Sequence, residues 1–138
     1  MSLQAVIAPA VAQAFLTLTI LFVMGYWRFK AVKAGEVKVI DAASSQISWP
    51  RYAAQAQRSF MNQLETPMLF FALIPLVVFT KTYDVLFVTL AWIWFATRLV
   101  HAVVHCTSNA LSLRFPAFIV GVVVLVIMWV VFAVRLAA

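Results

Sequence analysis

The sequence predicts an all-α integral membrane protein, a single domain over residues 1–138 that folds as a four-transmembrane-helix bundle. Of the 138 residues, 66% are hydrophobic and only 10% are charged, whereas a soluble domain usually carries about 25% charged residues. A spanning helix needs roughly 20 apolar residues, so we expect four spans, one polar loop and no extramembrane domain. The apolar stretches are continuous, which argues against the alternating strands of a β-barrel.

The first span is expected at about residues 6–27, where Tyr26 and Trp27 mark a membrane interface. It is too long for a cleavable signal and lacks the basic start of one, so we expect it to stay in place. Residues 28–58 form a polar loop with six basic and two acidic residues. The positive-inside rule puts this loop in the cytoplasm, where it can contact anionic membrane lipids.

Three further spans are expected at about residues 59–80, 85–106 and 115–134. Pro67 and Pro75 should bend the second span, residues 81–84 make a tight turn, and Arg135 closes the fourth span. The turn between spans two and three holds one base and one acid, whereas nearly all other bases lie at the opposite membrane level. Both termini are therefore expected outside the cytoplasm.

Two polar stripes interrupt the apolar spans at the expected cytoplasmic level. The second span carries one at spacing i, i+4, i+7: Arg58, Asn62 and Glu65. The third span carries another at spacing i, i+3, i+7: Arg98, His101 and His105. At 100° per residue, each stripe covers roughly 60° of one helix face. Stripes at one depth on neighbouring helices can satisfy each other's hydrogen bonds.

The stripes have two interpretations that the spacing leaves open. A charge near the middle of a span costs about 2.5–3.5 kcal/mol on insertion scales, so neither Glu65 nor Arg98 is expected to face lipid. One interpretation is an ion pair of Glu65 with Arg98 or Arg58 that fixes helix register. The other is a polar pocket for a charged ligand. The same residues can serve both purposes.

No metal site and no nucleic-acid partner are expected. His101 and His105 are spaced i, i+4 as in zinc-binding helices, but no suitably placed carboxylate, thiol or third histidine accompanies them. The net charge of +6 belongs largely to the basic loop, which is typical of a juxtamembrane segment. Cys106, inside an apolar helix, is interpreted as a small buried hydrophobe.

The two stripes resemble the signatures of a known family. The segment from Arg58 through Asn62 and Glu65 to Pro67 resembles an R-x-x-x-N-x-x-E motif followed by proline. The segment from Arg98 to His105, with a downstream arginine at 114, resembles a second signature, R-x-x-H-x-x-x-Y. Together they resemble the membrane-associated proteins in eicosanoid and glutathione metabolism, the MAPEG family. The N-x-x-E-x-P pattern from Asn62 to Pro67 is most similar to the bacterial branch of that family.

The resemblance implies a homotrimer that binds glutathione as co-substrate between subunits near the cytoplasmic side, in a bacterial inner membrane. It implies that Arg114 stabilises the glutathione thiolate as the catalytic residue. The glutathione-binding positions it implies are Arg58, Asn62, Glu65, Arg98, His101 and His105. The thiolate would then attack a lipophilic small molecule or reduce a hydroperoxide.

The sequence also departs from the family pattern. His105 and Phe118 stand where the family has tyrosines, and Phe115 stands where the prostaglandin synthase has serine. The resemblance therefore favours a glutathione S-transferase or peroxidase over a prostaglandin synthase. The alternative function is a non-catalytic membrane scaffold or lipid- or thiol-binding protein, with the polar residues as a structural network. A small multidrug exporter is disfavoured because the first span holds no acidic residue.

Overall fold

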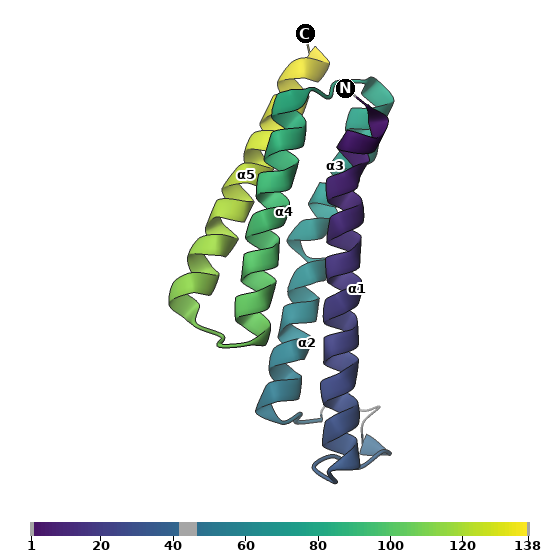
Figure 1. Cartoon of the computed structure of the whole chain (residues 1–138), viewed down its shortest axis with the longest axis vertical. Helices are drawn as coiled ribbons and strands as arrows, with labels where there is room; N and C mark the ends of the chain where they lie inside the picture. Colours follow the sequence, from purple (N-terminus) through teal and green to yellow (C-terminus); the bar gives the residue numbers. More distant parts are fainter. Residues whose placement is uncertain (1, 42–46, 138) are drawn as a thin grey trace.

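The computed structural model describes residues 2–41 and 47–137, and this part of the chain is helical without strands. The helices are, in order, α1 (Leu3–Lys33), α2 (Arg51–Leu64), α3 (Thr66–Thr80), α4 (Val85–Cys106) and α5 (Leu111–Ala137). Because α3 continues the course of α2, the two make one broken span (Figure 1). Four spans of sufficient length and hydropathy result, which confirms the predicted all-α membrane bundle.

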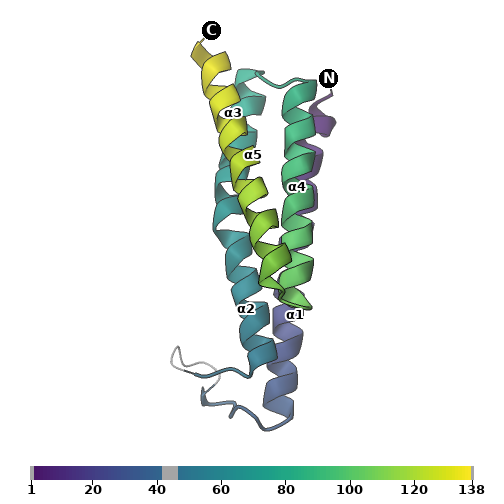
Figure 2. The same ribbon diagram turned by 90° about the vertical axis from the view of Figure 1, so that its left-hand side faces the viewer.

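The helix ends follow local chemistry. The Ser2 hydroxyl accepts a hydrogen bond from the Ala5 amide at the start of α1, and the Asp84 carboxylate accepts one from the Phe87 amide at the start of α4. Such caps satisfy amides that have no partner within the helix. Lys81 ends α3 in the left-handed conformation at φ 55°. The tight turn that follows puts both termini at one end of the bundle (Figures 1 and 2).

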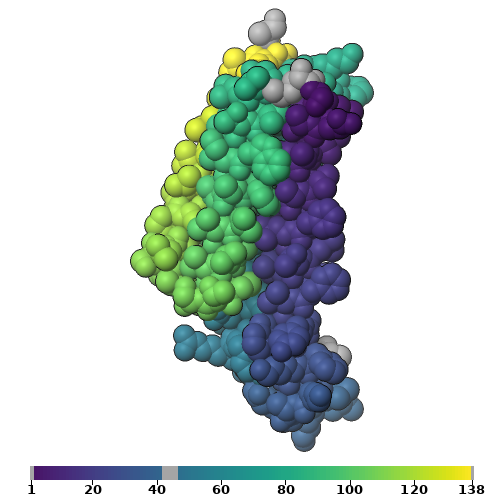
Figure 3. Space-filling model, viewed as in Figure 1, coloured from purple at the N-terminus to yellow at the C-terminus, as the bar shows by residue number. Residues whose placement is uncertain are grey.

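The helices α1 and α2 extend into the segment expected to be a polar loop. The 31 residues of α1 correspond to about 46 Å, well over the roughly 30 Å of a hydrocarbon core. The last turns of α1 and the first turns of α2 project together beyond the α4–α5 loop (Figure 3). Trp27 packs there against Tyr52, and Arg28 donates a hydrogen bond to Gln57.

The second span is interrupted at Glu65, whose backbone angles are φ −82° and ψ −91°. Pro67 lies two residues later, in the first turn of α3. A proline tolerates that position because its missing amide would have no partner there. Pro75 lies inside α3 without ending it. Of the two prolines expected to bend the span, Pro67 therefore accompanies a full break.

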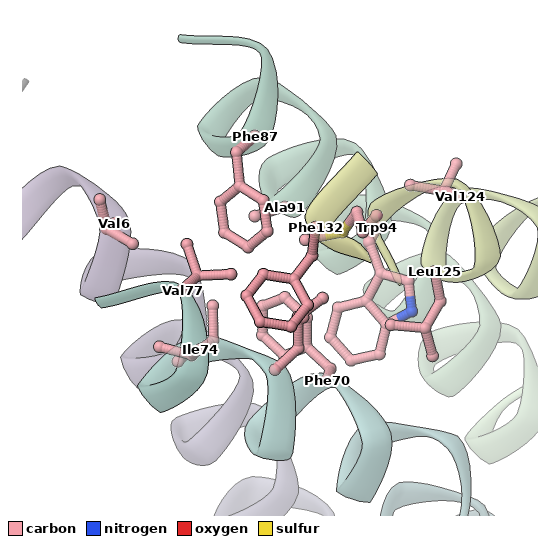
Figure 4. Packing of buried hydrophobic residues seen from close by; sticks show 13 residues of the cluster. Val6, Phe70, Ile74, Val77, Phe87, Ala91, Trp94, Val124, Leu125 and Phe132 are labelled. Carbon is pink, nitrogen blue, oxygen red and sulfur yellow. The ribbon is translucent and has the colours of Figure 1, made fainter. Parts of the chain in front are cut away.

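An apolar core packs in the half of the bundle nearer the termini (Figure 4). At its centre the rings of Phe70 and Trp94 stack with centroids 4.0 Å apart. The buried polar side chains cluster instead in the other half, on α1, α2 and α4: Gln13, Ser59, Gln63, Arg98, His101 and His105. The fold thus gathers its buried polar side chains in the half that faces the α4–α5 loop, beside a smaller apolar cluster of Leu16, Ile20 and Ala102.

Candidate functional site

A cavity of about 180 Å³ lies between α2, α4 and α5 near the α4–α5 loop. Three helices each contribute one polar lining residue, namely Asn62, His101 and Arg114. The rest of the lining is apolar and comes from α5: Leu111, Phe115 and Phe118. Three of the site residues predicted from the sequence therefore meet around one small space.

Arg114 sits in the first turn of α5 and is half-buried. Its guanidinium donates a hydrogen bond to the side-chain oxygen of Asn109. Asn109 adopts φ 52°, a left-handed conformation that asparagine tolerates better than most residues. Asn109 lies in the loop after α4, which ends at Cys106, and from there it helps to orient Arg114 at the edge of the cavity.

Arg98 is buried, with only 1% of its surface exposed. Its Nη2 donates a hydrogen bond of 2.9 Å to the backbone carbonyl of Asn62. The side chain of Asn62 donates in turn to the carbonyl of Arg58. Arg98 therefore contacts α2 directly, but it is not among the residues that line the cavity.

The two histidines are buried together, with their ring centroids 5.6 Å apart. His101 is 3% exposed and His105 2% exposed, and only His101 lines the cavity. The His101 ring also lies 5.8 Å from that of Phe118. Within residues 2–41 and 47–137, neither Nδ1 atom has a hydrogen-bond partner. The same part of the chain holds no cluster of three or more potential metal ligands.

Arg58 and Glu65 lie on the exposed surface of the second span. Over the described residues, the ion pair formed is that of Arg135 with Asp84, at the opposite end of the bundle. Neither ion pair considered for Glu65 from the sequence is therefore formed. The three residues of the stripe on the second span therefore differ in their surroundings. Asn62 lines the cavity, whereas Arg58 and Glu65 are exposed.

One polar contact was not anticipated. Gln13 of α1 donates a hydrogen bond of 2.9 Å to the side-chain oxygen of Gln63 on α2, and both amides are buried. The signal was present in the sequence, since an amide inside an apolar first span requires a polar partner. Gln63 itself gives no such signal, because it lies among other polar residues.

The fold and the site define the class: a four-helix integral membrane protein with a small polar cavity between three of its helices. The family model of the MAPEG family matches residues 6–134. The chain belongs to the MAPEG family, as its motifs indicate. This family includes glutathione-dependent transferases and peroxidases. Comparison with curated proteins and with solved structures gave no match.

Proposed function

We propose that this MAPEG protein is a glutathione-dependent transferase or peroxidase for lipophilic electrophiles, with Arg114 as the residue that stabilises the thiolate. The observation that carries this proposal is the meeting of Arg114 with Asn62 and His101 around one cavity. The apolar side of that cavity, formed by Phe115 and Phe118, suits an electrophile dissolved in the bilayer.

The chemistry requires a thiolate. A free thiol has a pKa of about 8.5 and is mostly protonated at neutral pH. Lowering that pKa by about two units needs roughly 2.7 kcal/mol of preferential stabilisation of the anion. A guanidinium that hydrogen-bonds the sulfur at a partly desolvated site supplies stabilisation of this size. We propose that the half-buried guanidinium of Arg114 is this donor.

The local charge also favours an anionic ligand. Three arginines surround this region, namely Arg58, Arg98 and Arg114, with Glu65 as the one carboxylate in the two stripes. Glutathione carries two carboxylates and one amine, so its net charge complements the excess of cations. We propose that Arg58 binds a carboxylate of glutathione and that Glu65 accepts from its amine or orients an arginine. His105 would reach the ligand only if its buried ring moved.

A single chain does not complete such a site. Ligand pockets usually measure about 300–1,000 Å³, and this cavity measures about 180 Å³. Glu65 is exposed, although the 15 residues of α3 place it about 22 Å from the far end of the span. A carboxylate at that depth is not left facing lipid. We propose that a homotrimer covers it, with glutathione between subunits and both termini outside the cytoplasm of a bacterial cell.

The alternative function is a non-catalytic scaffold or binding protein, in which the polar residues form a structural network. The hydrogen bond from Arg98 to the Asn62 carbonyl favours this view for Arg98. A purely structural network, however, would pair its members with one another and leave no space. The cavity and the two histidine Nδ1 atoms without partners in the described chain support the enzymatic proposal.

The test is a titration of the detergent-solubilised protein with glutathione, followed by calorimetry and by ultraviolet absorbance of the thiolate. We expect saturable binding with a thiolate signal that is lost in Arg114→Ala. The matched control is Arg51→Ala, because Arg51 is exposed at the start of α2 and should leave the signal intact. Binding without thiolate would refute the role of Arg114. No binding at millimolar glutathione would refute the glutathione site.

A further inference from the structure

We propose that Arg98 is a positioning residue, which caps the end of α2 and thereby holds Asn62 in the cavity, rather than a residue that binds the co-substrate. The resemblance implies that Arg98 contacts glutathione. The structure instead joins its guanidinium to the backbone of the neighbouring helix. The effect on ligand binding rests on the proposed function, but the capping role does not.

The break at Glu65 leaves α2 with carbonyls that need donors. The last four carbonyls of a helix have no partner within it, and the missing amide of Pro67 also removes the donor that the Gln63 carbonyl would have in a continuous helix. Within a membrane span, water is not available to take that place. Asn62 is the third residue from the end of α2, so its carbonyl is one of the four. The Nη2 of Arg98 lies 2.9 Å from this oxygen.

Packing between α4 and α5 directs the Arg98 side chain toward α2. Gly121 of α5 approaches the side chain of Thr97, and a Cβ built on Gly121 would lie 4.0 Å from the Cδ of Arg98. The ring of Phe118 lies 5.9 Å from the Cζ of Arg98. The guanidinium is thus confined between α5 and α2. It remains outside the cavity lining, and among the lining residues its hydrogen bond goes to Asn62, so we expect it to act on the cavity through that residue.

Asn62 is the lining residue that depends most on this cap. The backbone carbonyl of Asn62 accepts the hydrogen bond from Arg98, and the side-chain amide of Asn62 donates to the backbone carbonyl of Arg58 one turn earlier. Both contacts fix the last turn of α2, from which the Asn62 side chain reaches the cavity. Loss of the cap should therefore loosen this turn and misplace one polar group of the site.

The first test needs no ligand. Backbone hydrogen exchange is measured over residues 60–70 in wild type, Arg98→Met and Arg98→Lys. Methionine has a similar length but no donor, so we expect exchange at the junction of α2 and α3 to become faster by about tenfold. Lysine keeps a donor and should restore slow exchange. Arg51→Met serves as the matched control without effect. Unchanged exchange in Arg98→Met would overturn the proposal.

The second test uses glutathione and the cycle of Arg98→Met with Asn62→Ala. If Arg98 acts through Asn62, each single variant weakens binding by about tenfold, and the double variant is no weaker than either. If Arg98 contacts the ligand itself, the losses multiply toward about 100-fold and the proposal falls. If wild type binds no glutathione, the proposed function fails, and hydrogen exchange still decides the role of Arg98. Should Arg98→Met not fold, Arg98→Gln replaces it in both tests, because its shorter side chain does not reach the Asn62 carbonyl, and it should give the same pattern.

Discussion

The contact between α4 and α5 depends on the absence of a side chain at position 121. A Cβ built on Gly121 would lie 2.7 Å from the Oγ1 of Thr97 and 3.6 Å from its Cβ. The hydroxyl cannot give way freely, because it donates a hydrogen bond of 2.6 Å to the carbonyl of Trp94. Gly121→Ala must therefore rotate Thr97 or separate the two helices.

The size of the effect follows from two opposing terms. Replacing glycine by alanine within a helix stabilises by roughly 0.5–1 kcal/mol. Overpacking a tight contact costs about 1–3 kcal/mol, including loss of the hydrogen bond of Thr97. From the middle of each range, we expect Gly121→Ala to destabilise the protein by about 1 kcal/mol net. In the background of Thr97→Ala the close contact is gone, because the remaining Cβ at 3.6 Å is an ordinary neighbour.

The assay is thermal or denaturant unfolding in detergent of wild type, both single variants and the double variant. The matched control is Gly25→Ala, because nothing lies within 4 Å of a Cβ at Gly25. Gly25→Ala should be neutral or slightly stabilising, and Gly121→Ala should lower the midpoint. In the background of Thr97→Ala, Gly121→Ala should no longer destabilise. A close contact between Gly121 and Thr97 is contradicted if Gly121→Ala is as stable as wild type, or if Gly121→Ala is equally destabilising in the background of Thr97→Ala.

Two further predictions concern stability at either half of the bundle. The hydrogen bond from Arg135 holds the pKa of Asp84 below its ordinary value, so the ionised form of Asp84 stabilises the fold above about pH 4. Because Asp84 is exposed, Asp84→Asn should cost at most about 1 kcal/mol at pH 7. The difference in stability between wild type and Asp84→Asn should shrink as the pH falls below about 4 and vanish once Asp84 is protonated in the folded protein. A difference in stability that stays constant with pH would contradict this. Gln13→Leu leaves the buried amide of Gln63 unpaired at a cost of about 1–3 kcal/mol. Gln63→Leu should cost less, because the Gln13 amide keeps its hydrogen bond to the Thr17 hydroxyl, and the double variant should approach wild-type stability. A double variant that unfolds as readily as the sum of the singles would exclude the pairing.

Much of this architecture follows from composition and spacing. Runs of apolar residues predict the four spans, because backbone polar groups in lipid must bond within their own helix. The third span and α4 share the bounds 85–106. The break at Glu65 was expected only as a bend at Pro67. Local sequence indicates that a proline interrupts a helix, but the residue at which the backbone turns depends on which side chains of neighbouring helices donate hydrogen bonds to the freed carbonyls.

The candidate site shows the same division. Periodicity placed Arg58, Asn62 and Glu65 on one helix face, and the resemblance suggested a shared ligand for all three. The structure directs Asn62 to the cavity and leaves Arg58 and Glu65 exposed. The spacing of residues in the sequence gives only their angle around one helix axis. Whether a residue lines the cavity also depends on how close the next helix lies at that level.

Local hydropathy and motifs within single helices are enough to assign the membrane class, the number of spans and the family. Which polar groups meet depends on the folded bundle. It assigned Arg98 to the carbonyl of Asn62 and Gln13 to Gln63, and it left Glu65 without an ion pair in the described chain. Such pairings depend on helix rotation and crossing distance, which follow from side-chain packing across the whole bundle, such as the close approach of Gly121 to Thr97.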